Sequence, residues 1–427
     1  MDDAPQLREA SAKCLSQLNA LLEHTLENNP FYRKRLEGVA TQLPFRSLEA
    51  FAQGVPLTTK ADWIADQQAH PPYGTNLSFP LEAYTRCHQT SGTTGKPMRW
   101  LDTPASWDAM LQAWNRVYAA AGIESQDRAF FAFSFGPFLG FWTAFEAAQQ
   151  RGMFSLSGGG MTTETRLRAM VDHGCTVLCC TPTYALRLAE VAAELGLAGK
   201  DFALRAIMVA GEPGGSLPAM VQQLQAFWPQ AQIWDHHGMT EVGPVSYQCA
   251  DYPCSLHVIQ DAFHAEVLDP ERLVPVAPGE EGELILTTLN RLGSPLIRYR
   301  TGDLVQAPRD QVCRCGQTDP RLDGGILGRC DDMVVVRGVN VYPSAIDQIV
   351  RSHPSILEYR VDVFTLQSLT ELKVFIEPQV GVTQPEALAA KLARDFQVSL
   401  ALRVPVEVVE PGTLPRFEMK ARRWHRL

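Results

Sequence analysis

The chain has 427 residues, of which 45% are hydrophobic and 20% charged, and its formal net charge is -9. These fractions are typical of a soluble globular protein with enough apolar material for two or three folding units. The acidic balance argues against a nucleic-acid partner, because no broad positive field would attract phosphates. The chain begins Met1-Asp2-Asp3 and has no apolar run of about 18 residues, so we expect a cytoplasmic protein without a membrane partner.

The first half of the chain alternates helical and β-like patterns. Apolar residues recur at helical spacing over 7–38, and Asn29-Pro30 predicts a stop within that region. Residues 84–104 predict two short strands around a glycine-rich loop. From about 106 to 235, helical stretches alternate with β-like runs, which predicts parallel sheets covered by helices. The β-like runs are 129–135, 176–180, 206–209 and 232–235.

The second half changes to a period of two over 262–306, as in 265–268 and 283–287, which predicts a small antiparallel sheet or barrel. A glycine-rich stretch ends near 328, and strands at 333–337, 359–364 and 371–377 with a helix at 385–396 follow. We therefore expect an α/β fold. A large N-terminal domain of helix-covered sheets would span 1–328, with a β-rich subdomain at about 245–325, and a smaller α/β C-terminal domain would span 329–427.

The glycine-rich loop has the parts of a phosphate cradle: glycines that turn backbone N–H groups toward an anion, hydroxyl donors and a cation. It is not a Walker A loop, because only two residues separate its glycines and Pro97 follows Lys96. An ordinary hairpin turn is the alternative. The loop residues are Ser91, Gly92, Thr93, Thr94, Gly95 and Lys96.

This string resembles the phosphate loop of the adenylate-forming superfamily, which includes acyl-CoA synthetases, adenylation domains and luciferases. The resemblance continues in the family's order down the chain. The matching segments are 211–216 (Gly-Glu-Pro-Gly-Gly-Ser), 237–241 (His-Gly-Met-Thr-Glu), 299–304 (Tyr-Arg-Thr-Gly-Asp-Leu), 328–332 (Gly-Arg-Cys-Asp-Asp) and Lys420.

Within that superfamily, the chain most resembles phenylacetate–CoA ligases and related aryl-CoA ligases. Residues 29–34 (Asn-Pro-Phe-Tyr-Arg-Lys), 337–344 (Arg-Gly-Val-Asn-Val-Tyr-Pro-Ser) and 313–316 (Cys-Arg-Cys-Gly) carry this likeness. It implies an AMP-forming acid–thiol ligase with a mobile C-terminal domain. Such an enzyme uses ATP and Mg²⁺ to convert a small, aromatic acid to acyl-AMP with release of pyrophosphate, and then passes the acyl group to coenzyme A.

Two alternatives stay open. The acceptor thiol could belong to the phosphopantetheine arm of a carrier protein, since both thiols arrive on the same pantetheine chain. The protein could also be a non-catalytic, zinc-bearing relative that has kept the fold, although the matched Lys420, Glu241 and Asp303 speak against this. Relatives commonly pair, so a homodimer is an expectation.

The resemblance assigns roles to the residues that match its motifs. Glu241 would be a ligand of Mg²⁺, which proteins hold with one or two carboxylates plus substrate phosphates, and Thr240 would donate to a phosphate. A Thr-Glu pair at a helix N-terminus is the alternative. The nucleotide would also contact Gly211, Glu212, Pro213, Asp235, His236, His237, Gly238 and Met239.

Asp303 would accept hydrogen bonds from the ribose hydroxyls, because an ionised carboxylate only accepts. Arg329 would add a fork of donors near the same sugar. A plain turn at Gly302-Asp303 is the alternative reading. His237 departs from the family, which usually has an aromatic residue there, so it would stack or donate to a carboxylate, and a buried structural histidine is the alternative.

Lys420 matches the family's catalytic lysine, which reaches the attacking carboxylate and the α-phosphate. A compact cation on a long stem suits that transition state. Here 416–419 (Arg-Phe-Glu-Met) differs from the usual pattern before this lysine, and a solvated surface charge is the alternative. Asp331 matches the hinge about which the C-terminal domain swings, and an inert surface acid is the alternative.

A separate set of residues has the composition of a zinc site. Cys254 and His257 precede Cys313 and Cys315 by about sixty residues, and three sulfurs with one imidazole make a closed structural site. Cys249 is a competing ligand, and buried cytosolic thiols are the alternative.

A pocket for the acid is expected in the Phe- and Gly-rich stretch 131–141, with residues near 210–214 and 235–239. A slot lined by phenylalanines fits a flat ring, and an ordinary hydrophobic strand and loop is the alternative. The candidate pocket residues are Phe135, Gly136, Phe141, Ala210, Gly211 and His237.

Overall fold

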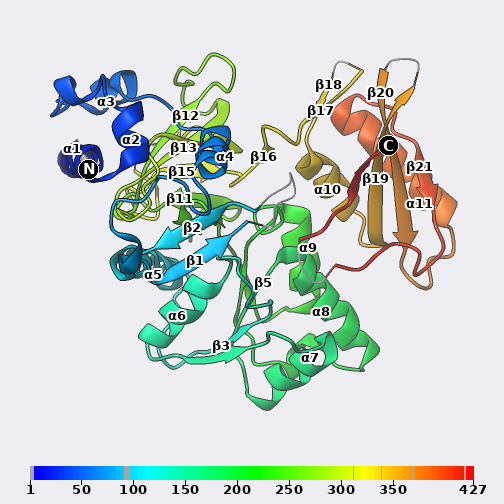
Figure 1. Cartoon of the computed structure of the whole chain (residues 1–427). Coiled ribbons are helices and arrows are strands. Elements are labelled where there is room, and N and C mark those ends of the chain that lie inside the picture. Colours follow the sequence, from blue (N-terminus) through cyan, green and yellow to red (C-terminus); the bar gives the residue numbers. More distant parts are fainter. Residues whose placement is uncertain (1–3, 91–96, 311, 338, 367–368, 418–419) are drawn as a thin grey trace. The chain divides into compact units, whose positions relative to one another are not determined.

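The computed structural model describes residues 4–90, 97–310, 312–337, 339–366, 369–417 and 420–427 (Figure 1). The chain divides into two compact units. The first comprises Met1–Gly159 and His236–Gly325, and the second comprises Gly160–Asp235 and Ile326–Leu427. Across the ranges that the structure describes, none of the helices has the length and apolar character needed to cross a membrane.

The first unit combines helices with small sheets. Its helices are α1 (Ala4–Asn28), α2 (Pro30–Arg35), η1 (Ala40–Gln42), α3 (Leu48–Gly54), α4 (Lys60–Ala69), η2 (Leu81–Ala83), α5 (Pro104–Ala120) and α6 (Trp142–Gln150). Its strands are β1 (Arg86–Gln89), β2 (Arg99–Asp102), β3 (Arg128–Phe131), β4 (Phe154–Ser157), β8 (Gly238–Met239), β9 (Gly243–Pro244), β10 (Ser246–Gln248), β11 (Ser255–Val258), β12 (Phe263–Leu268), β13 (Glu281–Thr288), β14 (Tyr299–Gln306) and β15 (Arg321–Asp323).

Local chemistry explains several of these boundaries. The predicted stop at Asn29-Pro30 is confirmed: α1 ends at Asn28, and the Asn29 side chain accepts from the Tyr32 N–H to cap α2. Thr59 and Asp62 form a capping box that starts α4 at Lys60. Thr103 caps α5, whose first residue is a proline.

The β-rich part of the first unit is antiparallel, as the period of two predicts. Strands β12, β13 and β14 pair in chain order, with Ala265 opposite Leu286 and Ile285 opposite Arg300. Strands β10, β11 and β15 form a second small sheet. The strands β1 and β2 pair on either side of the glycine-rich loop, with Gln89 opposite Arg99.

The second unit contains a parallel sheet and a C-terminal module. Its helices are α7 (Thr163–Asp172), α8 (Pro182–Glu194), η3 (Gly199–Asp201), α9 (Pro218–Phe227), α10 (Pro343–Arg351) and α11 (Pro385–Leu400). Its strands are β5 (Val177–Cys180), β6 (Ala206–Val209), β7 (Gln232–Asp235), β16 (Gly328–Arg329), β17 (Val334–Val336), β18 (Val339–Val341), β19 (Ile356–Leu366), β20 (Leu369–Pro378), β21 (Val406–Val408) and β22 (Trp424–Arg426).

Strands β5, β6 and β7 are parallel neighbours and are joined through α8 and α9. All four residues of β5 and of β6 are buried, as expected of a sheet covered on both faces. Because parallel strands place their carboxyl ends at one edge, the segments after Val209 and Asp235 leave this sheet at the same edge.

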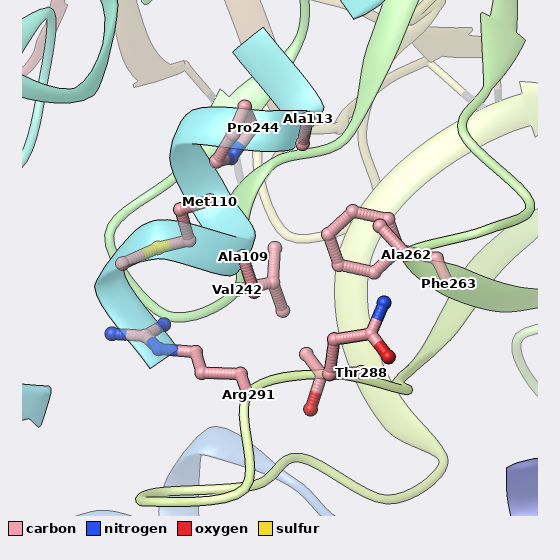
Figure 2. Close-up of a pocket in the computed structure, with 10 residues that line it drawn as sticks. Ala109, Met110, Ala113, Val242, Pro244, Ala262, Phe263, Thr288 and Arg291 are labelled. Atoms are coloured by element: carbon pink, nitrogen blue, oxygen red, sulfur yellow. The ribbon is translucent and has the colours of Figure 1, made fainter. Parts of the chain in front are cut away.

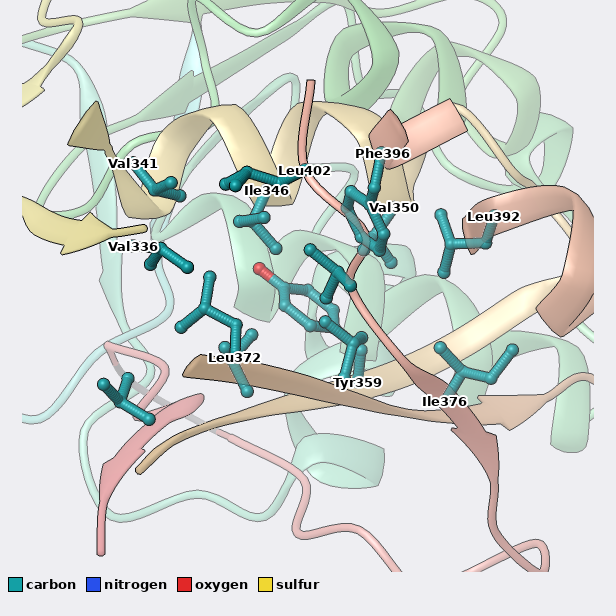
Figure 3. Packing of buried hydrophobic residues seen from close by; sticks show 14 of the residues in the cluster. Val336, Val341, Ile346, Val350, Tyr359, Leu372, Ile376, Leu392, Phe396 and Leu402 are labelled. Atoms are coloured by element: carbon teal, nitrogen blue, oxygen red, sulfur yellow. The ribbon is translucent and has the colours of Figure 1, made fainter. Parts of the chain in front are cut away.

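The C-terminal module packs α10 and α11 on a sheet of order β21-β20-β19-β22. Figure 3 shows Ile346 and Val350 from α10 and Phe396 from α11 converging on Tyr359 of β19. All four side chains are buried, and they belong to one hydrophobic core that this module contains. The strand β22 follows the segment with Lys420 and pairs with β19, with Val361 opposite Trp424.

Candidate active site and metal centre

The predicted phosphate loop, Ser91 to Lys96, lies outside the described residues. The residues on either side of the loop are hydrogen-bonded to each other. The Thr90 N–H donates to the Met98 carbonyl at 2.9 Å. The Met98 N–H in turn donates to the Thr90 hydroxyl at 3.2 Å. The chain therefore enters and leaves this loop through one closed antiparallel pair.

Thr240 and Glu241 occupy the tip of a short hairpin rather than a helix N-terminus. The hairpin pairs β8 with β9, with Met239 opposite Gly243, so a three-residue tip of Thr240, Glu241 and Val242 remains. Gly243 has φ 92°, a backbone conformation that favours glycine. The Glu241 side chain is only 9% exposed, and Lys60 Nζ lies 3.4 Å from its Oε1.

Arg291 binds the backbone of this tip through its guanidinium group. Its Nη1 donates to the Thr240 carbonyl at 3.3 Å and also to the Glu241 carbonyl. These bonds give both carbonyls a partner, which buried backbone acceptors require. The tip is therefore held through its main chain, which leaves the Glu241 carboxylate available to other partners.

His237 contacts Asp303, the residue predicted to accept hydrogen bonds from the ribose. Its Nε2 donates to Asp303 Oδ2 at 3.0 Å, because the carboxylate is an acceptor only. The Asp303 side chain is 5% exposed and that of His237 is 13% exposed. A donor at this distance orients the Asp303 carboxylate.

His236 is a buried residue whose ring contacts other groups of the protein interior. Its Nδ1 donates to the Ser246 carbonyl at 2.6 Å, and its ring centroid lies 4.3 Å from that of Trp114. Burial lowers the pKa of His236 to about 3, so its imidazole is neutral in the pH range where proteins work. The one N–H group of this neutral ring, at Nδ1, therefore already has an acceptor in the Ser246 carbonyl.

Aromatic rings line the stretch where an acid pocket was expected. The rings of Phe133 and Phe135 stack with centroids 4.4 Å apart, and Phe133 and Phe141 lie 5.1 Å apart. Trp142 donates to the Gly136 carbonyl at 3.0 Å. Phe135, Gly136, Phe141 and His237 belong to the first unit, whereas Ala210 and Gly211 belong to the second. The assembly of all six into one pocket remains a prediction.

In the second unit, the turn after β6 meets the segment that carries Lys420. A Cβ added to Gly211, whose φ is 97°, would lie 3.6 Å from Lys420 Cε. The neighbouring Glu212 accepts from the Thr183 N–H at 2.9 Å and from the Ala421 N–H at 2.8 Å. One carboxylate therefore connects the first turn of α8 with the residue that follows Lys420.

The rest of this turn packs directly on Asp235. A Cβ at Gly215 would lie 2.3 Å from Asp235 Oδ1, so only glycine fits there without a shift. The Ser216 hydroxyl donates to Asp235 Oδ2. The structure thus brings the 211–216 motif against the end of β7, as their places at one edge of a parallel sheet require.

Arg329 and Asp331, predicted as a ribose contact and a hinge, form an ion pair with each other. Arg329 Nε donates to Asp331 Oδ1 at 3.0 Å and Nη2 donates to Oδ2 at 3.2 Å. The Asp331 side chain is 69% exposed. This is a two-point contact between a half-buried arginine and an exposed aspartate, and ion pairs that water reaches contribute little to stability.

A candidate metal centre is formed by Cys249, His257, Cys313 and Cys315, whose ligand atoms all lie within 4.8 Å of one another. Cys249 Sγ and Cys313 Sγ are 3.6 Å apart, and Cys315 Sγ is 3.3 Å from His257 Nε2. Tetrahedral zinc with Zn–S bonds of about 2.3 Å separates sulfurs by about 3.8 Å. The donor set and its spacing therefore fit Zn²⁺.

The surroundings of this centre favour the metal-binding forms of His257 and Cys313, whereas burial raises the pKa of Cys249 and that of Cys315. His257 Nδ1 donates to the Asp319 carbonyl at 2.7 Å, which turns the Nε2 lone pair toward the cysteines. Burial lowers the pKa of His257. Burial disfavours a Cys313 thiolate, but the Cys315 backbone N–H and the Arg321 guanidinium outweigh it, so the pKa of Cys313 is lowered.

Cys254, predicted as the fourth ligand, lies outside this group of four, and Cys249, the competing ligand in the sequence, belongs to it. Tyr247 pairs with His257 across β10 and β11. The Cys249 N–H donates to the Ser255 carbonyl. Cys249 and His257 therefore share one face of this sheet. Cys254 lies one residue before β11 with φ 64°, which puts it out of phase with that face.

Sequence reasoning missed three residues that the structure places at these sites. Lys60 contacts Glu241, Arg291 binds the Thr240–Glu241 backbone, and Trp114 packs on His236. Each lies more than a hundred residues from its partner except Arg291, which is about fifty residues away. No local pattern marks such residues, because their roles arise only from the tertiary contact.

Two family models match the chain: AMP-binding enzyme over residues 88–290, and AMP-binding enzyme C-terminal domain over residues 338–425. The phenylacetate-coenzyme A ligase of Thermus thermophilus is 32% identical over 423 residues, which is 94% of this chain and 93% of that protein.

Solved structures of 2-hydroxyisobutyryl-CoA ligase are also similar. Its postadenylation state in complex with 2-HIB-AMP superposes with a TM-score of 0.91 at 30% identity, covering 98% of this chain and 89% of that one. Its thioesterification state, in complex with 2-HIB-AMP and CoA, has a TM-score of 0.73 at 30% identity, with 98% and 90% covered. The chain therefore belongs to the adenylate-forming AMP-binding enzymes, and within them to the AMP-forming acid–CoA ligases.

Proposed function

We propose that this ligase activates a small aromatic carboxylic acid. As an acid–CoA ligase, the protein converts an acid and ATP to acyl-AMP and pyrophosphate, and then transfers the acyl group to CoA with release of AMP. Support for an aromatic acid comes from the clustered rings of Phe133, Phe135 and Phe141, since aromatic walls favour a flat apolar ring. The relative from Thermus thermophilus is named for phenylacetate.

The adenylation step needs groups that bind phosphate and neutralise charge on the α-phosphoryl group. Lys420 is proposed as the cation that approaches both the acid's carboxylate and the α-phosphate, where fixed positive charge lowers the barrier. The turn at Gly211 to Pro213, which lies against Lys420 in the second unit, is proposed to contact the nucleotide. Asp303, oriented by His237, is proposed to accept the ribose hydroxyls.

Glu241 is proposed as a Mg²⁺ ligand, with Thr240 donating to a phosphate. The Glu241 carboxylate is buried and lies 3.4 Å from the half-exposed Lys60 ammonium group, and carboxylate oxygens are the ligands that a hard cation prefers. When bound with ATP, Mg²⁺ neutralises phosphate charge and so favours departure of pyrophosphate. The hairpin tip would hold the carboxylate in place for this role through its backbone contacts.

Transfer to the thiol requires a second arrangement of the same site, and Asp331 is proposed as the hinge residue. Its carboxylate forms an ion pair with Arg329, and because the Asp331 side chain is 69% exposed, this interaction costs little to break. Coenzyme A is favoured over a carrier protein because the relatives named above are CoA ligases. A homodimer and a cytoplasmic location stay predictions.

A structural zinc ion is proposed at Cys249, His257, Cys313 and Cys315. All four protein positions of a tetrahedral site are filled by soft sulfurs and one imidazole, which leaves no open position for substrate. The ion would connect β10 and β11 with the loop that carries Cys313 and Cys315, and so stabilise the β-rich part of the first unit.

The proposal for the acid is tested with a panel of benzoates, phenylacetates and short aliphatic acids, each incubated with the protein, ATP, Mg²⁺ and CoA. We expect acid-dependent pyrophosphate release and the matching acyl-CoA, identified by mass spectrometry, with the highest kcat/KM for an aromatic acid. A preference for an aliphatic acid would refute the aromatic assignment. Acyl transfer to a carrier protein but not to CoA would contradict the proposed acceptor.

A further inference from the structure

Arg291 forms a buried, two-point ion pair with Asp102, and no sequence motif predicts this pair. It follows β13, and its side chain is 3% exposed. Its Nε donates to Asp102 Oδ1 at 2.6 Å and its Nη2 donates to Asp102 Oδ2 at 2.7 Å, and the Asp102 side chain is fully buried. Parallel N–H···O bonds of this kind fix both groups in one geometry, which a single ammonium group does not do.

The remaining nitrogen of the same guanidinium contacts the candidate Mg²⁺-binding hairpin. Arg291 Nη1 donates to the carbonyls of Thr240 and Glu241. Asp102 ends β2, the strand that leaves the glycine-rich loop. One planar side chain therefore connects the strand beside the predicted phosphate loop with the tip that carries Glu241, although the two are separated by more than a hundred residues.

The surroundings of Arg291 beside the tip are mostly apolar. Figure 2 shows Arg291, Val242 and Met110 lining one pocket beside α5, with Thr288 across from them. Val242 follows Glu241 directly, and this pocket wall is mostly apolar. Apolar contacts are not directional, so the guanidinium supplies the directional restraint on the tip.

We propose that Arg291, held by Asp102, is a positioning residue that sets the Glu241 carboxylate for Mg²⁺ bound with ATP. The inference rests on the proposed role of Glu241. A misplacement of about 1 Å at a reacting centre can cost about 100-fold in rate. Loss of the fork should therefore weaken Mg²⁺–ATP binding and adenylation together, even though Arg291 itself touches neither the metal nor the acid.

The chain offers a matched control in Arg298. This arginine is also buried, donates to both oxygens of Glu266 at 2.9 and 2.8 Å, and donates to the backbone carbonyls of Ala52 and Val55. Its chemistry and burial match those of Arg291, but the carbonyls that it binds lie at the end of α3. Arg298→Lys should therefore lower stability without changing the hairpin tip.

The test compares Arg291→Lys and Arg298→Lys in the full chain. Binding of Mn²⁺ in the presence of ATP, measured by electron paramagnetic resonance without any acid, should weaken about 10-fold or more in Arg291→Lys. It should change less than about 2-fold in Arg298→Lys. Acid-dependent pyrophosphate release as a function of Mg²⁺ concentration should shift in the same way, and thermal unfolding should show that both variants are folded.

Unchanged Mn²⁺ binding in folded Arg291→Lys would overturn this inference alone, as would an equal loss in Arg298→Lys. If Arg291→Lys does not fold, Asp102→Asn takes its place and should weaken Mn²⁺ binding in the same direction. Failure of the unaltered protein to release pyrophosphate with any acid would instead refute the proposed function, together with the role of Glu241 on which this inference depends.

Discussion

Glu212 lies in the turn proposed to contact the nucleotide, and its carboxylate also binds the protein's own backbone. Its two carboxylate oxygens accept from the Thr183 and Ala421 N–H groups, at 2.9 and 2.8 Å. Ala421 directly follows Lys420, so this contact restrains the segment that carries the proposed catalytic cation. The resemblance to the family predicted Glu212 as a nucleotide contact only, and the backbone partners could not be inferred from the sequence.

Replacing Glu212 should therefore affect the adenylation step. Glu212→Ala leaves both N–H groups without this acceptor, and we expect the rate of acid-dependent pyrophosphate release to fall about 10-fold or more. Glu194→Ala is the control, because Glu194 lies on the neighbouring α8 with its side chain 65% exposed. Equal rates for the two variants would show that Glu212 does not restrain Lys420.

The buried His236 predicts a loss of stability in mild acid. Burial lowers the pKa of His236 from 6.5 to about 3, so the unfolded chain binds one more proton between these values. Stability is then fully present above pH 6.5 and falls as the pH drops below it, by about 1.4 kcal/mol per pH unit for this one group.

Urea unfolding at pH 7, 6 and 5 measures this effect. His236→Asn removes the titrating ring but keeps a donor for the Ser246 carbonyl. The free energy of unfolding of the variant should therefore fall less steeply with decreasing pH than that of the parent. Parallel pH dependences would mean that His236 does not titrate on unfolding.

At the scale of elements, the metal centre depends on the register between β10 and β11 and on the loop before β15. If zinc is bound there, Cys313→Ser should lose it and lower the midpoint of thermal unfolding, because binding to the folded state contributes folding free energy. Cys254→Ser is the matched control, since Cys254 lies outside the group of four. Elemental analysis measures the zinc content of both variants, and thermal unfolding measures their stability.

The contrary pattern would be retention of zinc by Cys249→Ser and its loss in Cys254→Ser. That outcome would restore the ligand set that the sequence spacing had suggested. An unaltered protein purified without zinc, and unable to take it up, would contradict the proposed metal centre as a whole.

The sequence predicted whether a segment is a helix or a strand where its periodic pattern is long or lies between clear turn residues. The strands 206–209 and 232–235 match β6 and β7, and the helix predicted at 385–396 lies within α11. The strand predicted at 129–135 is shorter, because β3 ends at Phe131 and the following rings belong to the aromatic cluster. A run of phenylalanines has strand propensity, but here contacts between rings determine its conformation.

At the scale of the whole molecule, the order of the motifs predicted the family, because residues that serve one reaction recur in one sequence order. The contacts behind those motifs were not predictable. Arg291 and Lys60 act through partners that only the fold brings close, and no local spacing distinguishes them from ordinary surface or core residues. The candidate zinc site is an example. Both Cys249 and Cys254 were possible ligands from the sequence, and the register of β10 and β11 places Cys249, not Cys254, in the group of four.

The most direct test of the account is the effect of Lys420→Ala on each half-reaction. Acid-dependent pyrophosphate release should fall by about 100-fold to 1000-fold, as expected when one charge-stabilising group is removed. Transfer to CoA from supplied acyl-AMP should stay within a few-fold of the parent, and Arg422→Ala, which removes a nearby exposed cation, should leave both steps nearly unchanged. Undiminished pyrophosphate release in Lys420→Ala, or loss of the thioester step alone, would contradict the account.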